Sequence, residues 1–228
     1  MFDDIGGFLM NLIAGLPGIV IAMVVHEYAH ARVAYALGDY TPRLQGRLTL
    51  NPAAHVDPIG LLMLFIVHFG WAKPVQINPM NFSNPRRDDI LVSIAGPASN
   101  LITSFIALIV LVLLAKFDFP FSEGTLLVFN LIIIYNINFA IFNMLPIPPL
   151  DGSHILRNLL PYELARQYEY LERYSFIFLI IILMTPVLSY IFVPLQKFIF
   201  GIFQGIVNYC FKAGDCPYQN RKATPPRR

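Results

Sequence analysis

Two histidines and a glutamate lie within five residues of one another in the sequence HEYAH, at positions 26–30. On an α-helix, His26 and His30 lie on one face, because residues four apart stack one turn above the other. Two imidazoles at this spacing can hold a zinc ion, and the carboxylate of Glu27 beside them can take a proton from water. The pattern therefore predicts a hydrolytic metal centre at these three residues.

A third protein ligand is expected, because catalytic zinc usually has three protein ligands and one open position. The best candidate is Asp151, which follows an apolar stretch and the sequence PIPPL. An ionisable residue at the end of an apolar helix is costly unless it has a function. The alternative for Asp151 is a structural role, as the N-cap of a helix that begins at Gly152.

Hydrolysis of a peptide bond also needs hydrogen-bond donors for the oxyanion of the tetrahedral intermediate. Asn143 is one candidate, since it ends the same apolar stretch that leads to Asp151. His55 is a second candidate, in a polar segment that contains several prolines. The alternatives are helix-end capping for Asn143 and a part in the loop structure for His55.

The composition is that of a membrane protein, since 56% of the 228 residues are hydrophobic and only 13% are charged. Soluble domains contain about 25% charged residues. Stretches long and apolar enough to cross a bilayer cover residues 18–37, 89–115 and 125–145, and residues 175–211 have the length for two more. We therefore predict an all-α polytopic membrane protein with about five transmembrane helices. A single domain is expected at residues 1–211, followed by a basic tail at residues 212–228.

The apolar stretch at residues 59–71 is too short to cross a bilayer. It predicts a re-entrant or partly inserted segment, which is tolerated at membrane depth only where it lines a cavity or is buried in protein. On either side, residues 47–50 (RLTL) and 75–78 (VQIN) are predicted to form short strands near the active site. Irregular backbone near residues 46–51 and 146–149 is expected to pair with an unwound substrate segment as an added strand.

The distribution of Lys and Arg predicts an orientation in the membrane. With the N-terminus outside, residues 40–88, 153–174 and the tail inside, and residues 116–124 outside, most of the 16 Lys and Arg residues lie in cytoplasmic segments. This arrangement also brings His26, His30 and Asp151 to the same depth, in the cytoplasmic half of the bilayer. The agreement supports Asp151 as the third ligand.

Several stretches together resemble the site-2 protease family of intramembrane zinc metalloproteases, above all its small prokaryotic branch without PDZ or CBS domains. The stretches are HEYAHARVAYALGD, GRLTLNPAAHVDPIG, FGWAKPVQINP, SIAGPASN and FNMLPIPPLDGSHIL, and they cover most of residues 25–156. The resemblance implies zinc-dependent cleavage of transmembrane substrates. It also implies one zinc ion per chain at the positions of His26, His30 and Asp151, with Glu27 as the base.

We therefore expect a zinc-dependent intramembrane endopeptidase that cuts peptide bonds in or near transmembrane helices, close to the cytoplasmic face of a prokaryotic plasma membrane. Its expected partners are transmembrane protein substrates and the lipid bilayer, and no basic stretch indicates nucleic acid. The alternatives are a non-proteolytic zinc-containing membrane binding protein and a metal transporter. The first leaves Glu27 without a role, because a structural zinc site needs no adjacent base. The second should contain more ionisable residues along a path through the membrane.

Overall fold

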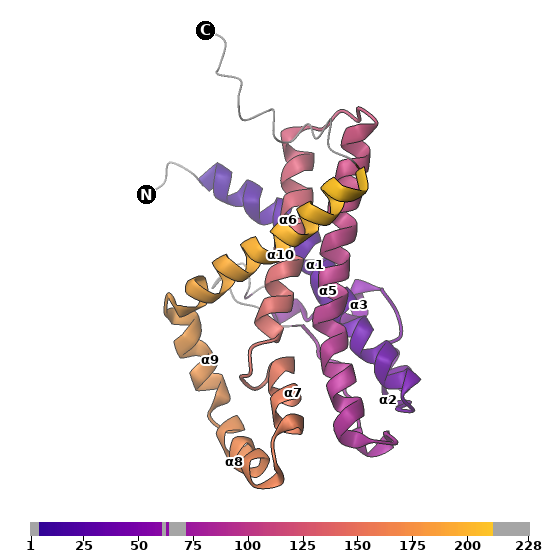
Figure 1. Cartoon of the computed structure of the whole chain (residues 1–228), viewed down its shortest axis with the longest axis vertical. Helices are drawn as coiled ribbons and strands as arrows, with labels where there is room; N and C mark the ends of the chain where they lie inside the picture. Colours follow the sequence, from indigo (N-terminus) through magenta and orange to yellow (C-terminus); the bar gives the residue numbers. More distant parts are fainter. Residues whose placement is uncertain (1–4, 61–62, 64–71, 212–228) are drawn as a thin grey trace.

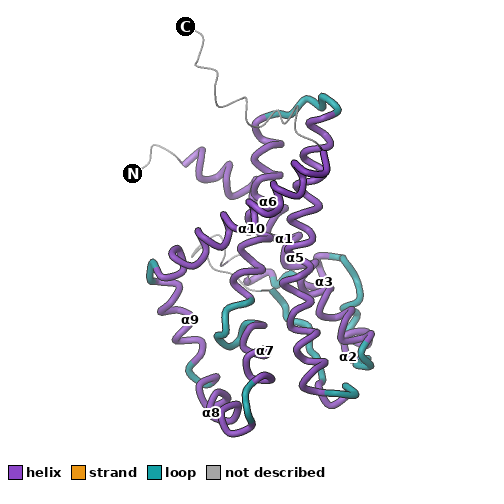
Figure 2. The backbone as a smooth tube through the Cα atoms, viewed as in Figure 1, coloured by secondary structure: helices purple, strands orange, loops and turns teal. Residues whose placement is uncertain are grey.

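The computed structural model describes residues 5–60, 63 and 72–211. The longest helices are α1 (Ile5–Ala36), α5 (Pro85–Lys116), α6 (Glu123–Asn143) and α10 (Val187–Phe211). Shorter helices are α2 (Thr41–Leu44), α3 (Pro52–His55), η1 (Pro79–Asn81), α7 (Asp151–Leu159), α8 (Tyr162–Glu172) and α9 (Ser175–Met184). Loops join these helices, and the described part of the chain contains no sheet (Figure 2).

Four of the described helices are long and apolar enough to cross a membrane: Leu12–Ala36, Pro85–Lys116, Glu123–Asn143 and Val187–Tyr209. This confirms the all-α polytopic class but corrects the expected number of about five spans. The difference lies in residues 175–211, where α9 has only 10 residues. At 1.5 Å per residue, such a helix covers about half of a hydrocarbon core roughly 30 Å thick. Pro186, which has no backbone N–H, stands between α9 and α10.

Helices α1, α5 and α6 contact one another along much of their lengths and form a three-helix core (Figure 1). Small side chains allow the close approach, as in other membrane helix pairs. Ala22, Ala31 and Ala34 of α1 are fully buried. A Cβ atom at Gly18 would lie 3.1 Å from the backbone of Ile132, so the backbones of α1 and α6 nearly touch there.

Local signals set the ends of these helices. Helix α1 stops before Gly38, whose φ of 106° is a conformation that residues with a Cβ atom rarely adopt. Helix α5 starts after Asn84, whose side chain accepts a hydrogen bond from the backbone N–H of Arg87, and Pro85 occupies the first turn. Ser122 caps α6 in the same way through the N–H of Thr125. These signals fix the residues at which α1 ends and at which α5 and α6 begin.

The segment after α1 is tied down by Asp39, which is fully buried. Its carboxylate accepts hydrogen bonds from Thr41, from the backbone N–H of Asn78 and from the side chain of Asn81. Burial raises the pKa of the Asp39 carboxyl, but these hydrogen bonds together outweigh burial and hold that pKa below its usual value. Asp39 thus joins the end of α1 to residues 78–81.

The two predicted strands are not formed among the described residues. Residues 47–50 and 75–78 pair in no ladder, and one isolated antiparallel bridge joins Val56 to Ala72. Side chains hold these segments instead, because Arg47 donates to the carbonyl groups of Ala54 and Lys73. Most of the predicted partly inserted segment, residues 61–62 and 64–71, lies outside the described residues.

Helix α9 leads away from α8, and α10 continues across α6 toward the end of α5 near the loop between α5 and α6 (Figure 1). Val207 of α10 is buried in a cluster with Ala107 and Leu111 of α5, close to the end of α5 at Lys116. The described chain therefore ends opposite α7 and α8. The tail at residues 212–228, which the sequence predicts to be cytoplasmic, lies outside the described residues.

Candidate active site

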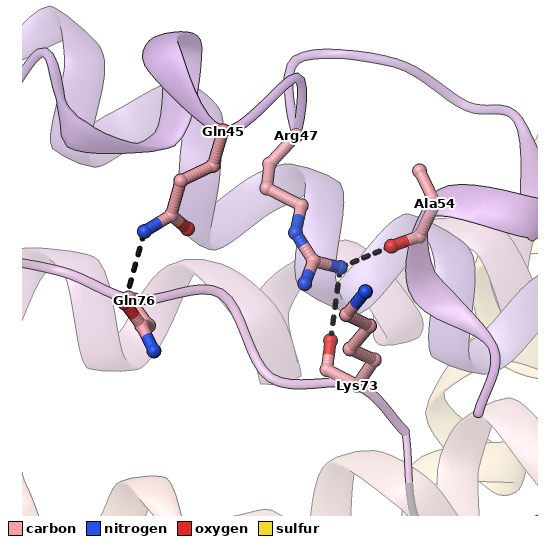
Figure 3. Close-up of a pocket in the computed structure, with 5 residues that line it drawn as sticks. All are labelled: Gln45, Arg47, Ala54, Lys73 and Gln76. Carbon is pink, nitrogen blue, oxygen red and sulfur yellow. Dashed lines mark hydrogen bonds between the residues drawn. The ribbon is translucent and has the colours of Figure 1, made fainter.

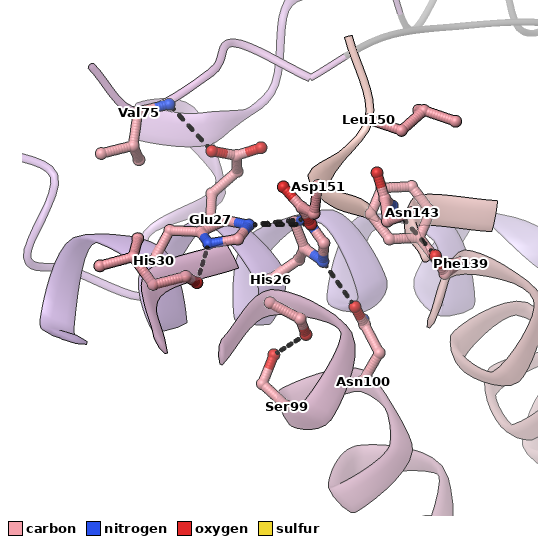
Figure 4. A network of polar contacts seen from close by, with 12 residues as sticks. His26, Glu27, His30, Val75, Ser99, Asn100, Phe139, Asn143, Leu150 and Asp151 are labelled. Atoms are coloured by element: carbon pink, nitrogen blue, oxygen red, sulfur yellow. Dashed lines mark hydrogen bonds and ion pairs between the residues drawn. The ribbon is translucent and has the colours of Figure 1, made fainter. Parts of the chain in front are cut away.

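Three potential metal ligands converge where α1, α5 and α7 meet (Figure 4). The Nε2 atoms of His26 and His30 are 3.0 Å apart. The Oδ2 atom of Asp151 lies 3.1 Å from the first and 3.3 Å from the second. Both histidines are buried in α1, and Asp151 is the first residue of α7. The structure thus brings together all three ligands predicted from the sequence.

The tautomer of His30 follows from its partner. Its Nδ1 atom lies 2.8 Å from the carbonyl oxygen of Val92. A carbonyl oxygen can only accept a hydrogen bond, so Nδ1 carries the proton and Nε2 carries a lone pair. The lone pair of His30 therefore faces the cluster.

The tautomer of His26 follows from a chain of three amide contacts. The Nδ2 atom of Asn136 donates to the carbonyl of Ile132, which leaves its Oδ1 to accept from Asn100. The Nδ2 atom of Asn100 also donates to the carbonyl of Ala22, so its Oδ1 faces Nδ1 of His26 at 2.8 Å. Nδ1 of His26 must then carry the proton, and its Nε2 lone pair also faces the cluster.

These donors fit zinc. Two lone pairs and a carboxylate oxygen repel one another at such distances unless a cation lies among them. The Oδ2 atom of Asp151 is buried and accepts no hydrogen bond, which a buried oxygen seldom tolerates without another partner. Zinc bonds of about 2.0 Å at tetrahedral angles separate ligand atoms by about 3.3 Å, close to the distances found here. Three ligands with a free fourth position are typical of catalytic zinc rather than structural zinc.

Two glycines let the helices approach this cluster. A Cβ atom at Gly96 of α5 would lie 2.6 Å from Cε1 of His26 and would also overlap Nε2 of His30. A Cβ atom at Gly152 would lie 2.6 Å from the carbonyl oxygen of Leu145, at the end of α6. Any larger residue would push α5 away from the histidines or move Asp151.

Helix α7, which carries Asp151, is fixed to the first turns of α5. Asp89 of α5 is buried, and its Oδ2 atom accepts a hydrogen bond from Asn158 and pairs with Arg157 at 3.3 Å. His154 lies 3.5 Å from the same oxygen. One carboxylate thus holds three side chains of α7, which fixes the orientation of Asp151 at the start of that helix.

Glu27 faces the cluster from the side of the loop at residues 72–78 (Figure 4). Its Oε2 atom accepts a hydrogen bond of 2.9 Å from the backbone N–H of Val75. This contact fixes one carboxylate oxygen and leaves the other for a reacting group. The position next to the metal ligands is the one that a general base requires.

The two oxyanion candidates differ in position. Asn143 is buried, and its Nδ2 atom donates to the carbonyl of Phe139 in its own helix; the ring of Phe139 packs against His26 at a centroid distance of 5.0 Å. His55 is also buried, and its polar contacts join α3 to neighbouring loops. Its Nε2 atom bonds to the carbonyl of Thr49, and its own carbonyl accepts from Lys73. The geometry therefore favours Asn143 over His55 as a residue of the site.

Three residues that support the ligands were not predicted from the sequence: Asn100, Gly96 and Asp89. A signal was present in SIAGPASN, because Gly96 and Asn100 are four residues apart and therefore lie on one face of α5. A small residue and an amide on one face of a membrane helix indicate a close, hydrogen-bonded contact with another helix. That the partner is a metal ligand depends on the packing of α5 against α1.

Comparison with known proteins identifies the family. A model of Peptidase family M50 matches residues 120–185, which contain Asp151. A Bacillus subtilis protein named "Putative zinc metalloprotease YwhC" is 41% identical over 196 residues, covering 82% of this chain and 90% of that relative. The chain belongs to peptidase family M50.

A second relative of this M50 peptidase is a Mycolicibacterium smegmatis protein named "Putative zinc metalloprotease Rip2", which is 31% identical over 87% of this chain and 77% of the relative. No solved structure matches the chain significantly. The family confirms the resemblance to site-2 proteases, so the protein is a zinc metalloprotease with zinc as its cofactor. The four long apolar helices among the described residues agree with a place in a membrane.

Proposed function

We propose that this M50 peptidase is an intramembrane endopeptidase, which hydrolyses peptide bonds in or near the transmembrane helices of membrane-protein substrates. The observation that carries the proposal is the position of the ligand cluster inside apolar helices. His26 belongs to the candidate span Leu12–Ala36, ten residues from its end, or about 15 Å along the helix axis. A peptide bond that reaches these side chains has to enter the membrane-spanning part of the protein.

The proposed chemistry uses the residues at the cluster. His26, His30 and Asp151 hold the zinc ion. When bound, zinc acts as a Lewis acid that polarises the peptide carbonyl and makes water a stronger nucleophile. Glu27 takes a proton from the attacking water and returns it to the nitrogen of the leaving amine. The N–H of Val75 keeps the carboxylate of Glu27 in the orientation that both transfers need.

Asn143 is the proposed oxyanion donor. Its Nδ2 atom has two hydrogens, and the carbonyl of Phe139 accepts one of them. The second hydrogen can stabilise the oxygen that becomes negatively charged during attack. The proposed role of His55 is structural, because its contacts with Thr49 and Lys73 hold the loops next to the site.

The cut is proposed to lie near the cytoplasmic face of a prokaryotic plasma membrane. Loops and short helices at the end of the molecule that contains α2, α7 and α8 carry most of the described cations outside the spans: Arg43, Arg47, Lys73, Arg157, Arg166 and Arg173. The loop at the other end follows Lys116. Cytoplasmic loops carry an excess of Lys and Arg, which assigns the first end to the cytoplasm.

A substrate helix must unwind before it is cut, because its carbonyl groups are hydrogen-bonded to residues four positions along. Gly, Pro or Asn near the cut should therefore favour cleavage. Replacement of such a weak point by Leu stabilises the substrate helix, by about 1 kcal/mol for Gly and about 3 kcal/mol for Pro. The expected substrates are single-span segments with a local weak point.

Cleavage of a single-span substrate in liposomes tests the proposal. Substrates are identified by comparing the membrane proteomes of cells with wild type and with Glu27→Gln. Glu27→Gln should keep its zinc and lose about 10²- to 10⁴-fold in rate, since it removes the base and leaves the ligands. Glu163→Gln, the same change at an exposed position on α8, is the matched control and should cleave normally. Wild-type turnover by Glu27→Gln would disprove the mechanism.

A further inference from the structure

A polar pocket lies next to the loop that contacts the proposed base. It has a volume of about 360 Å³. Figure 3 shows the residues that line it, which come from α3, from the segment just after α2 and from the loop at residues 72–78: Gln45, Arg47, Ala54, Lys73 and Gln76. The side chain of Gln45 donates to that of Gln76 and joins two sides of the pocket.

Arg47 places a buried positive charge in this pocket. Its side chain is only 6% exposed, and NH1 donates to the carbonyl groups of Ala54 and Lys73. No carboxylate of the described residues forms an ion pair with Arg47 or Lys73. A buried charge is costly without a partner of opposite charge, so the guanidinium favours an anion from outside the chain.

Lys73 adds a second cation to the same opening. Its side chain extends to the side of the pocket where the Arg47 guanidinium lies (Figure 3). None of the residues that line the pocket is acidic. Two cations and two amides therefore surround a space that is large enough for a carboxylate group and has no negative charge of its own.

The pocket is close to the reacting groups. Lys73 is two residues before Val75, whose N–H binds Glu27, and two extended residues span at most about 7 Å. The N–H of Lys73 donates to the carbonyl of His55, and Val56 pairs with Ala72. Lys73 of the pocket and the N–H that binds Glu27 therefore lie on one continuous segment, which these contacts hold in place.

We propose that this pocket binds the side-chain carboxylate of the substrate, so that the enzyme favours substrates with Asp or Glu within about four residues of the cut. The separation of Lys73 and Val75 corresponds to about two residues of an extended substrate at about 3.3 Å per residue, and the lengths of the Lys73 and substrate side chains extend this range to about four. The inference rests on the proposed function. A phospholipid headgroup is the weaker occupant, because Ala54 is the single apolar residue of the lining and offers no surface to acyl chains.

The first test measures kcat/KM in liposomes for a series of single-span substrates. Each substrate carries Glu, Gln or Lys at one position near the cut, and each such position is tested in turn. Wild type should prefer Glu over Lys by about tenfold or more at one position, as expected for a hydrogen-bonded charge pair. Lys73→Glu should reverse this order. Arg86→Glu, an equal charge change at an exposed residue outside the pocket, should leave it unchanged.

Equal rates for Glu and Lys at all positions would overturn the proposal. It would also be overturned if Lys73→Glu abolished only a dependence of the rate on phosphatidylglycerol, since the pocket would then bind a lipid headgroup. Failure of wild type to cleave any substrate would instead contradict the proposed function.

A second test does not depend on cleavage. In the Glu27→Gln background, a photo-cross-linking amino acid replaces Gln76. It should cross-link several times more of the substrate with Glu at the preferred position than of the same substrate with Lys. Equal cross-linking of the two substrates would overturn the pocket assignment even if the protein proved to be a protease.

Discussion

The three-helix core of α1, α5 and α6 and the outer helix α10 are both apolar, but they are packed in different ways. In the most apolar window of each helix, 39% of the residues are buried in α1, whereas 6% are buried in α10. Asn100 and Asn136 join the three core helices through side-chain hydrogen bonds. Helix α10 packs against this core through apolar side chains, among them Val207, Phe192 and Phe203.

This difference indicates what specifies the site. In a membrane, apolar side chains gain little from contact with one another, because lipid tails are equally apolar. Small residues and buried amides therefore decide which helices stay together, and in this protein the same amide of Asn100 also orients His26. Two of the three metal ligands therefore lie on α1, in the core that polar contacts hold together. Helix α10 covers this core through apolar contacts, such as those of Val207.

The largest expected effect is on the orientation of Glu27. Val75→Pro removes the N–H that binds Glu27 and should lower kcat by about 10²-fold, because a small displacement of a catalytic group has an effect of that size. Val75→Ala keeps the N–H and should retain most activity. Steady-state kinetics with a measured zinc content checks the pair, and equal rates for both variants would show that the contact does not position the base.

The second largest effect is expected on zinc affinity when the amide of Asn100 is removed, because this amide hydrogen-bonds the metal ligand His26. Asn100→Leu should weaken zinc binding by about 10- to 100-fold, which is the usual result of removing a hydrogen bond to a metal-bound histidine. Asn130→Leu is the matched control, since the side chain of Asn130 donates only to Leu126 in its own helix. Competition with a chelator measures both affinities. Similar zinc affinities for the two variants would show that Asn100 does not support the metal site.

A pair of cavity substitutions compares the two regions directly. Ile137 of α6 is fully buried in the core, and Ile137→Ala should cost about 2–5 kcal/mol of stability. Val207→Ala in α10 should cost less, about 1.6 kcal/mol, because it removes two buried carbon groups rather than three. Thermal unfolding in detergent gives both values. A larger loss for Val207→Ala would contradict the proposed difference in packing.

The smallest effect concerns Asp39 and pH. The pKa of this carboxyl is lower in the folded protein than in the unfolded chain, where it is about 3.9. The ionised group therefore stabilises the fold above about pH 4, and this stability is lost as the pH falls through the folded pKa. Wild type should unfold at a higher temperature than Asp39→Asn at pH 7, and the difference should shrink toward pH 3. A constant difference would contradict this linkage.

Much of the site could be predicted from sequence because its signals are local. The spacing of His26 and His30 identifies a helix face, and Asp151 stands out as a charge at the end of an apolar stretch. The role of Asn100 could not be predicted in this way, because its partners in α1 and α6 are defined only by packing. A sequence also contains no direct sign that the carbonyl of Val92 orients His30.

The errors in the fold have similar causes. Residues 175–211 have the length for two spans, but the division at Pro186 leaves α9 with only 10 residues, which is too short to be counted as a span. The residues 47–50 have the composition of a strand, yet Arg47 and His55 use their side chains to bond the neighbouring carbonyl groups. In both cases, one residue with a strong local effect outweighed the pattern of its segment.

X-ray absorption at the zinc edge of the purified protein tests the central claim, that donors from α1 and α7 form one zinc site within the membrane helices. The predicted spectrum shows two imidazole nitrogens and one or two oxygens at about 2.0–2.1 Å. Asp151→Ala should lose zinc or show a changed oxygen shell. Sulfur neighbours at about 2.3 Å, or a spectrum that Asp151→Ala leaves unchanged at full zinc content, would contradict the account.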